Sequence, residues 1–162
     1  MTPIYARAPR GERAPGRAPA RRGTNVTLVA ALSLEGSGAA MTLAGALDRA
    51  ACEVYVRDVL GPTLRPGQVV IWDNVRAHQG DGVRAAIEAR GCRLLFLPPY
   101  SPDFNPIEEA FSKLKEALRR AEARTREALE AAIAAALDAI TAQDARGWFA
   151  HCGYLPLAQP SC

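Results

Sequence analysis

Hydrophobic residues follow two kinds of spacing along this chain, and together they predict an alternation of strands and helices. Short runs rich in β-branched and apolar residues predict strands at residues 25–34, 39–43, 69–72 and 93–97. Apolar residues at helical spacing predict helices at 52–60, 82–89, 106–120 and 126–140, and a last short helix from Thr141 that ends at Gly153. The predicted order is β-β-α-β-α-β-α-α-α.

The runs at 69–72 and 93–97 are apolar without polar alternation. Such runs are typical of parallel strands that are covered on both faces. The helix predicted between them, at 82–89, would connect the two strands by a right-handed crossover, which makes them parallel neighbours. The sequence therefore predicts an α/β fold.

Two acidic residues stand where α/β proteins commonly place sites, at a strand end and a helix start. Asp73 follows the run at 69–72, and Glu108 lies in the first turn of a helix that opens with Asn105 and Pro106. Asn suits a helix N-cap and Pro the first helical position. A structural role is open for both acids, because Asn105 and Glu108 have the spacing of a capping box and Asp73 suits a turn or an N-cap.

The combination of two motifs carries a resemblance to a known family. Asp73-Asn74-x-x-x-His78 is followed by Leu97-Pro98-Pro99-Tyr100-Ser101-Pro102-Asp103-x-Asn105-Pro106-Ile107-Glu108, with 34 residues between Asp73 and Glu108. In both motifs and in this interval the chain resembles the DDE superfamily transposases, specifically the mariner-like group of bacterial insertion sequences. The resemblance implies a ribonuclease-H-like mixed sheet flanked by helices, with Asp73 and Glu108 as the second and third catalytic, metal-binding acids.

The same resemblance implies a first Asp at the end of a central strand, and this chain begins after that point. Asp48 is expected in a turn and Asp58 within a helix, so neither replaces it. The fold would then lack its first, central strand, which would lie between the strands at 25–34 and 69–72. The expected cofactor is Mg²⁺ or Mn²⁺, in a two-metal site that needs the missing Asp.

The resemblance predicts a transposase catalytic-domain fragment for DNA cleavage and strand transfer, inactive without an upstream transposase segment. The alternative is a non-catalytic nucleic-acid-binding or interaction module that retains the fold. A Mg²⁺-dependent phosphohydrolase would leave the motif at 97–103 unexplained. Asn74, His78 and Asn105 are expected to support the site, although His78 also suits a hydrogen-bonded structural role. Asp103 is expected in a turn and Glu109 toward solvent.

Charge is distributed unevenly. The net charge is +3, yet residues 1–23 hold six arginines and one acid, and the rest of the chain has 14 basic and 16 acidic residues. Cationic side chains bind nucleic acid by releasing counterions from phosphates, and the alternative is a solvated tail. Helical spacing adds two cations beside Glu108, and the alternative is a surface ion-pair ladder among the three side chains. The predicted DNA-binding residues are Arg7, Arg10, Arg13, Arg17, Arg21, Arg22, Lys115 and Arg119.

These observations divide the chain into a basic, Pro-rich and Arg-rich extended segment at 1–23, a partial catalytic domain at 24–155 and a tail at 156–162. The expected partners are the DNA of transposon ends and target, and further copies of the chain. The four cysteines form no C-x-x-C pair, which favours free thiols in a reducing cytoplasm. No signal peptide or bilayer-spanning run is predicted.

Overall fold

The computed structural model of the protein describes residues 25–73, 81–99 and 101–154. The strands are β1 (Val26–Ser33), β2 (Gly36–Ala44), β3 (Val69–Trp72) and β4 (Arg93–Phe96). The α-helices are α1 (Arg49–Val54), α2 (Asp81–Glu88), α3 (Pro106–Ala121), α4 (Arg126–Asp138) and α5 (Ala142–His151). The described residues also include a π-helix, η1 (Tyr55–Leu60), and the 3-10 helices η2 (Gly61–Thr63) and η4 (Pro102–Phe104). The predicted order of strands and α-helices is confirmed.

The four strands form two separate two-stranded sheets. The hairpin of β1 and β2 is antiparallel, and β3 pairs with β4 in parallel, with Trp72 opposite Phe96. The parallel pairing of β3 and β4 was predicted, because apolar runs joined through a helix favour it. Among the described strands no hydrogen-bonded ladder joins β1 to β3, the position at which the family resemblance implies the central strand.

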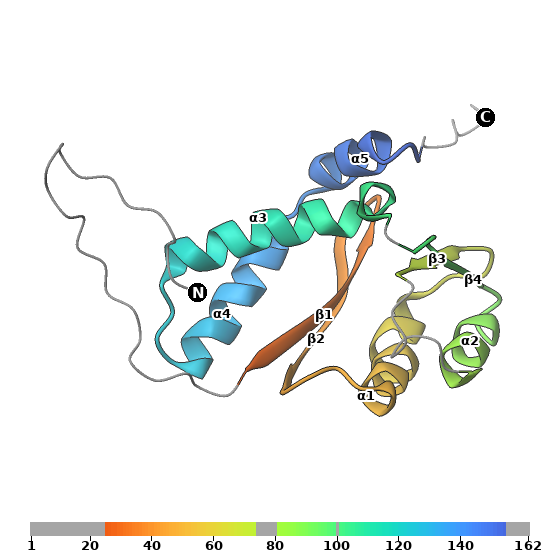
Figure 1. Cartoon of the computed structure of the whole chain (residues 1–162), viewed down its shortest axis with the longest axis horizontal. Helices are drawn as coiled ribbons and strands as arrows, with labels where there is room; N and C mark the ends of the chain where they lie inside the picture. The colour runs from red at the N-terminus through yellow and green to blue at the C-terminus, as the bar shows by residue number, and fades with distance from the viewer. Residues whose placement is uncertain (1–24, 74–80, 100, 155–162) are drawn as a thin grey trace, which may run out of the picture.

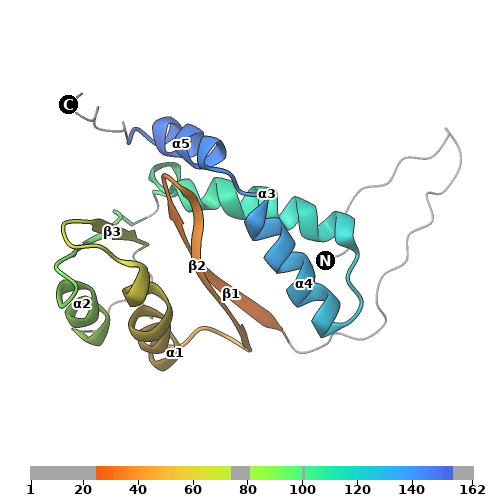
Figure 2. The same cartoon turned by 180° about the vertical axis from the view of Figure 1, so that it is seen from behind.

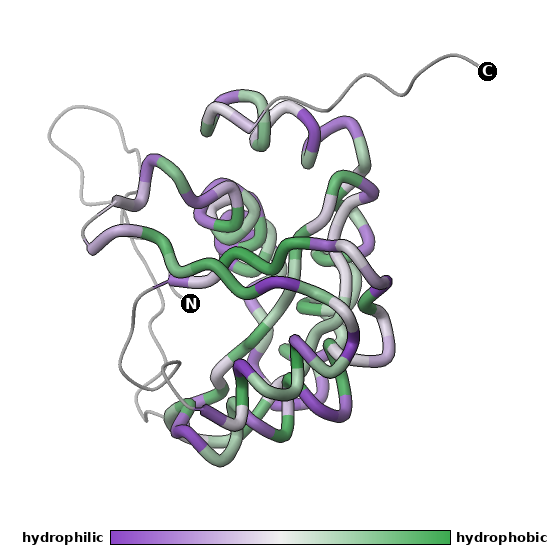
Figure 3. Tube along the Cα trace, turned by 90° about the vertical axis from the view of Figure 1, so that its right-hand side faces the viewer, coloured by the Kyte–Doolittle hydropathy of each residue, from purple (hydrophilic) through white to green (hydrophobic). Residues whose placement is uncertain are grey.

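Figures 1 and 2 show how the helices divide between the two sheets. α3 and α4 lie along the β1–β2 hairpin, whereas α1 and α2 lie with β3 and β4. The helices carry both hydrophobic and hydrophilic residues, as an amphipathic helix that covers a sheet must (Figure 3). α3 presents Ala110, Leu114 and Leu118 to the interior.

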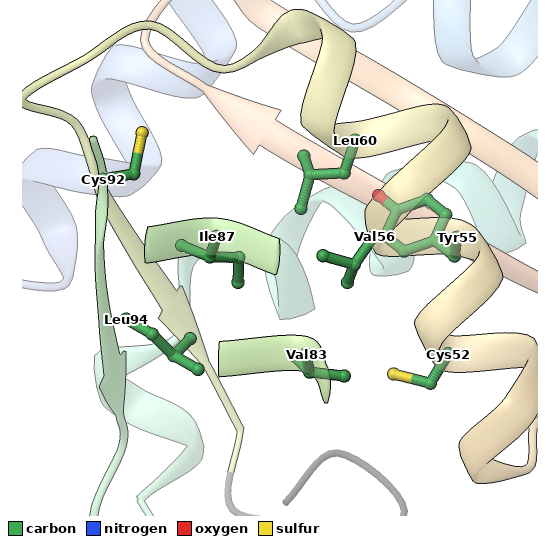
Figure 4. Packing of buried hydrophobic residues seen from close by; sticks show 8 residues of the cluster. All are labelled: Cys52, Tyr55, Val56, Leu60, Val83, Ile87, Cys92 and Leu94. Carbon is green, nitrogen blue, oxygen red and sulfur yellow. The ribbon is translucent and has the colours of Figure 1, made fainter. Parts of the chain in front are cut away.

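Two hydrophobic clusters result. The larger one joins α1, η1, α2 and β4, and Figure 4 shows its eight buried side chains: Cys52, Tyr55, Val56, Leu60, Val83, Ile87, Cys92 and Leu94. The smaller cluster joins α3 to α4 through Leu114, Leu118, Ile133 and Ala136. Strand β1 contributes Val29 to the first cluster and Leu28 to the second, as alternation along a strand requires. The hairpin therefore lies between the two clusters.

Local details correct two expectations. The helix predicted at 52–60 begins earlier, at Arg49. Asp48 caps it by accepting a 2.8 Å hydrogen bond from the Ala51 amide, so Asp48 is an N-cap and not only a turn residue. The helix also widens into a π-helix over η1. Asp58 lies within η1, as predicted, and pairs with Arg57 at 2.7 Å.

Other expectations hold. Cys52, Cys92 and Cys152 are free and buried, whereas Cys162 lies outside the described residues. Thr141 and Asp144 form a reciprocal capping box at the start of α5.

The unpaired sheet edges lead to a prediction about the isolated protein. β1 and β3 each leave one edge without a partner strand in the part of the chain that the structure describes, and open edges pair with other chains. We expect the purified chain to self-associate at micromolar concentration, or to unfold with low stability. Light scattering after size exclusion tests the first outcome and chemical denaturation the second. A monodisperse, cooperatively unfolding monomer would contradict the expectation.

Candidate functional site

Asp73 follows the last residue of β3 and is half-buried. The Leu97 amide donates a 2.8 Å hydrogen bond to the Trp72 carbonyl, so β3 and β4 end side by side. Burial raises the pKa of the Cys52 thiol to about 11, and the negative charges of Asp73 and Glu53 add to that effect. Asp73 is therefore near enough to Cys52, on α1, for its charge to act on that thiol.

Glu108 lies in the first turn of α3 and its side chain is exposed. Pro106 occupies the first helical position and Asn105 the N-cap, as predicted. The Asn105 side chain, however, accepts no hydrogen bond from the first turn of α3, so the prediction that this side chain caps the helix is wrong. The capping box that Asn105 and Glu108 could have formed is also absent: Glu108 joins this turn only through its backbone amide, 3.1 Å from the Asn105 carbonyl. The Glu108 carboxylate therefore makes no hydrogen bond to the N-cap of its own helix.

The ends of β3 and β4 and the start of α3 lie at the same end of the molecule in both views (Figures 1 and 2). The chain needs only residues 98–105 to connect β4 and Leu97 with α3. Carboxylates on a strand end and on a helix start can thus approach one site from two elements. Joint binding of a cation by Asp73 and Glu108 stays a prediction.

A cleft of about 200 Å³ opens beside Glu108, between the start of α3 and the end of α5. We call it the α3–α5 cleft; its lining residues are Pro102, Asp103, Asn105, Glu108, Glu109, His151 and Cys152. Three carboxylates line it, and the only cationic candidate in that lining is His151, whose Nε2 lies 3.9 Å from Glu109 Oε1. Such a cleft repels phosphate until a cation neutralises it.

Sequence patterns did not indicate His151 and Cys152. They lie more than 40 residues after Glu108, in no motif, and only the packing of α5 against α3 brings them to the cleft. Burial raises the pKa of the Cys152 thiol, with smaller contributions from the charges of Glu109 and Asp103. Asp103 lies in η4, in agreement with its predicted turn role, and Glu109 is exposed but also lines the cleft.

The donor atoms agree in kind with the expected metal. Mg²⁺ prefers hard oxygen ligands and retains several waters, and Asp73 and Glu108 supply carboxylate oxygens. Residues 25–73, 81–99 and 101–154 contain no group of three His, Cys, Asp or Glu side chains able to hold a metal ion. The two acids therefore fit a divalent cation in chemistry, and the need for a further acid stays a prediction.

Several predicted residues lie outside the described part of the chain. They are the supporting residues Asn74 and His78 and the six arginines Arg7, Arg10, Arg13, Arg17, Arg21 and Arg22. Lys115 and Arg119 are described: both are on α3, Lys115 exposed and Arg119 half-buried. Their roles in DNA binding stay predictions.

Comparison with known families decides the relationship. Residues 1–130 match the family described as DDE superfamily endonuclease. The chain belongs to this family. No curated protein matches its sequence. The bacterial insertion-sequence assignment stays a prediction.

Solved structures add the fold. The chain is similar to the Mos1 transposase paired-end complex with left transposon end, at a TM-score of 0.73 and 19% identity, over 96% of this chain and 48% of that one. It is also similar to the Mos1 mariner paired end complex with Mn, at a TM-score of 0.65 and 20% identity, over 93% and 47% of the two chains. The chain thus spans about half the length of these transposases, and the predicted ribonuclease-H-like α/β fold is confirmed.

Among the described residues of this DDE family member, no helix is both long enough and apolar enough to cross a bilayer.

Proposed function

We propose that this chain is part of a transposase catalytic domain that cleaves DNA and joins strands in transposition with the help of divalent metal ions. The observation that carries the proposal is the placement of two acids in a chain of the DDE superfamily endonuclease family. Asp73 ends a parallel strand and Glu108 opens the helix that begins at the same end of the molecule.

In this proposal Asp73 and Glu108 hold Mg²⁺ or Mn²⁺ through their carboxylates. Bound divalent cations would activate the attacking water or 3′-hydroxyl and stabilise the leaving oxygen. Asn105 starts the helix that carries Glu108, and Asn74 and His78 follow Asp73 in the sequence, where they can orient a carboxylate or contact a phosphate. The Mos1 complex with Mn supports a metal-dependent site.

DNA is the proposed partner. Lys115 is exposed on α3 two turns after Glu108, and Arg119 follows one turn later, so DNA phosphates that reach Glu108 meet cations on the same helix. The arginines of the basic segment 1–23 would add contacts that do not depend on DNA sequence. The Mos1 complexes with transposon ends support this partner, and we propose action in the cytoplasm on transposon ends and target DNA.

A third acid completes the proposed site. We place it on a strand that pairs between β1 and β3, where the two sheets leave open edges, and propose that a transposase segment upstream of residue 1 supplies it. The domain is then residues 24–155 together with that strand, and residues 156–162 form a tail. Without the strand, metal affinity is low and the chain does not cleave DNA.

Metal titration tests the proposed ligands. We expect Mn²⁺ to bind the purified chain weakly, and Asp73→Asn or Glu108→Gln to reduce its affinity at least about tenfold, because each removes one charged oxygen ligand; tenfold corresponds to about 1.4 kcal/mol. Electron paramagnetic resonance of free Mn²⁺ measures this directly. Glu116→Gln is the matched control, since Glu116 is an exposed carboxylate two turns further along the same helix.

Equal affinity in the unaltered chain and both variants would contradict the proposed ligands. It would favour the non-catalytic nucleic-acid-binding module, which requires no metal at these acids.

A further inference from the structure

The end of α5 has a specific geometry. Gly153 adopts a left-handed conformation with φ +86°, the Tyr154 amide donates to the Phe149 carbonyl at 2.8 Å, and the Gly153 amide donates to the Ala150 carbonyl at 3.0 Å. These two bonds define a Schellman motif, which normally includes an apolar contact across the turn. The rings of Phe149 and Tyr154 supply it, edge to face with centroids 5.9 Å apart. Tyr154 is therefore held in a defined position beyond the helix.

From this position Tyr154 reaches the loop that leads into α3. Its hydroxyl donates a 3.0 Å hydrogen bond to the Phe104 carbonyl, across 50 residues of sequence. The other hydrogen bonds among the described residues of this loop are local: the Phe104 amide donates to Ser101 O at 3.2 Å, the Asn105 amide to Pro102 O at 2.9 Å and the Ser101 hydroxyl to Pro99 O at 3.3 Å. Within the described residues, Tyr154 thus provides the loop's hydrogen bond to a distant element.

Packing and capping do little to fix this loop. The Phe104 side chain is 52% exposed, so it does not anchor the loop in a core. The Asn105 side chain makes no capping bond to the first turn of α3. A loop with exposed side chains and only short-range hydrogen bonds fluctuates easily unless another element ties it.

Helix α5 provides a firm support for that tie. Lys113, on α3, forms a 2.6 Å ion pair with Asp144 in the first turn of α5 and donates a 3.0 Å hydrogen bond to the Ala139 carbonyl. Asp144 also closes the capping box with Thr141, and Ala145 next to it is fully buried. Both ends of α5 are therefore fastened to α3 or to its entry loop.

We propose that the C-terminal end of α5 is a clamp that positions Glu108, with Tyr154 as the positioning residue. The Tyr154 hydroxyl fixes the Phe104 carbonyl, and Asn105, Pro106 and Ile107 then lead directly to Glu108. The clamp rests on the proposed function in one respect: it matters for catalysis only if Glu108 binds metal. A misplacement of about 1 Å at a reacting group can cost about a hundredfold in rate, so even a small release of the loop is significant.

A pair of tyrosine variants tests the clamp. Tyr154→Phe removes the hydroxyl that donates to Phe104 and keeps the ring. Tyr55→Phe is the matched control, because it removes a hydroxyl that donates to the Ala39 carbonyl at 2.9 Å from within the larger hydrophobic cluster. Amide hydrogen exchange at Asn105 and Glu108 reports the loop and helix start, Mn²⁺ affinity reports the Glu108 carboxylate, and the melting temperature reports the whole fold.

In Tyr154→Phe we expect exchange at Asn105 and Glu108 to accelerate about tenfold and Mn²⁺ affinity to fall severalfold, with little change in melting temperature. In Tyr55→Phe we expect the reverse: a lower melting temperature, with loop exchange and Mn²⁺ affinity unchanged. Gly153→Ala keeps the Tyr154 hydroxyl but strains the turn, and its Cβ would meet no atom within 4 Å. It should reproduce the effect of Tyr154→Phe on loop exchange.

The outcomes separate the clamp from the proposed function. Unchanged exchange in Tyr154→Phe would overturn the clamp. Faster exchange with unchanged Mn²⁺ affinity, where Glu108→Gln does lower that affinity, would also overturn it, because the loop would then not position the carboxylate. Suppose instead that Tyr154→Phe accelerates exchange but Glu108→Gln leaves the Mn²⁺ affinity unchanged. That result would support the clamp as a structural device and reject Glu108 as a metal ligand.

Discussion

Neutralising either proposed metal ligand is expected to abolish DNA cleavage in an extended protein that also carries the first acid. In such a protein, with a strand ending in Asp ahead of residue 1, Asp73→Asn or Glu108→Gln should reduce the rate of Mg²⁺-dependent cleavage at least about a thousandfold, equivalent to about 4 kcal/mol of activation free energy. Each amide keeps the shape of the side chain but loses the charge that holds the cation. Nicking of a supercoiled plasmid measures the effect.

Matched variants separate a lost ligand from general damage. Asp58→Asn and Glu116→Gln each neutralise an exposed carboxylate paired to a neighbouring arginine, and cleavage should remain. The chain of 162 residues by itself should show no nicking. Mg²⁺-dependent nicking by this chain alone, abolished by Asp73→Ala, would refute the need for a further acid.

The second large effect concerns stability. Ile87→Ala is expected to destabilise the protein by about 2–5 kcal/mol, because Ile87 is fully buried in the larger hydrophobic cluster and its loss leaves a cavity between α2, η1 and β4. That cost is a large share of the stability of a small domain, so the variant should unfold at a much lower urea concentration. Circular dichroism during urea unfolding measures the change.

Leu95→Ala provides the control for this prediction. Leu95 lies on the adjacent strand β4 but is 47% exposed, so the same kind of truncation should cost less than about 1 kcal/mol. Equal destabilisation by the two substitutions would show that the larger cluster is not the main source of stability.

The sequence predicted correctly those strands and helices whose local residue pattern favours the same structure as their packing in the fold. Strand β3 was predicted with its observed bounds because four apolar residues between turns have few alternatives. The expected cover on both faces is incomplete in the described residues, since Val69 on β3 is 43% exposed. The start of α3 was predicted from Asn105 and Pro106, whose backbone preferences suit a helix entry wherever it packs. Asp73 and Glu108 followed from these two elements.

Other features depend on packing that sequence spacing does not encode. The widened turn η1 brings Tyr55, Val56 and Leu60 to the core together, a spacing that fits an ordinary helix poorly. The α3–α5 cleft and the Tyr154 bond arise because α5 folds back onto α3, and no local signal in α5 specifies that contact. Sequence reasoning therefore pointed to the two acids that we propose as ligands, but not to Tyr154, which bonds to the loop ahead of Glu108.

The burial of Cys52 gives the protein a built-in chemical reporter. Cys52 has no exposed surface, and burial raises the pKa of its thiol to about 11, so it holds very little of the thiolate with which alkylating reagents react. Alkylation of Cys52 must therefore wait for the cluster around Ile87 to open. The rate at which iodoacetamide alkylates this sulfur therefore reports the fraction of molecules in which that part of the native structure is open.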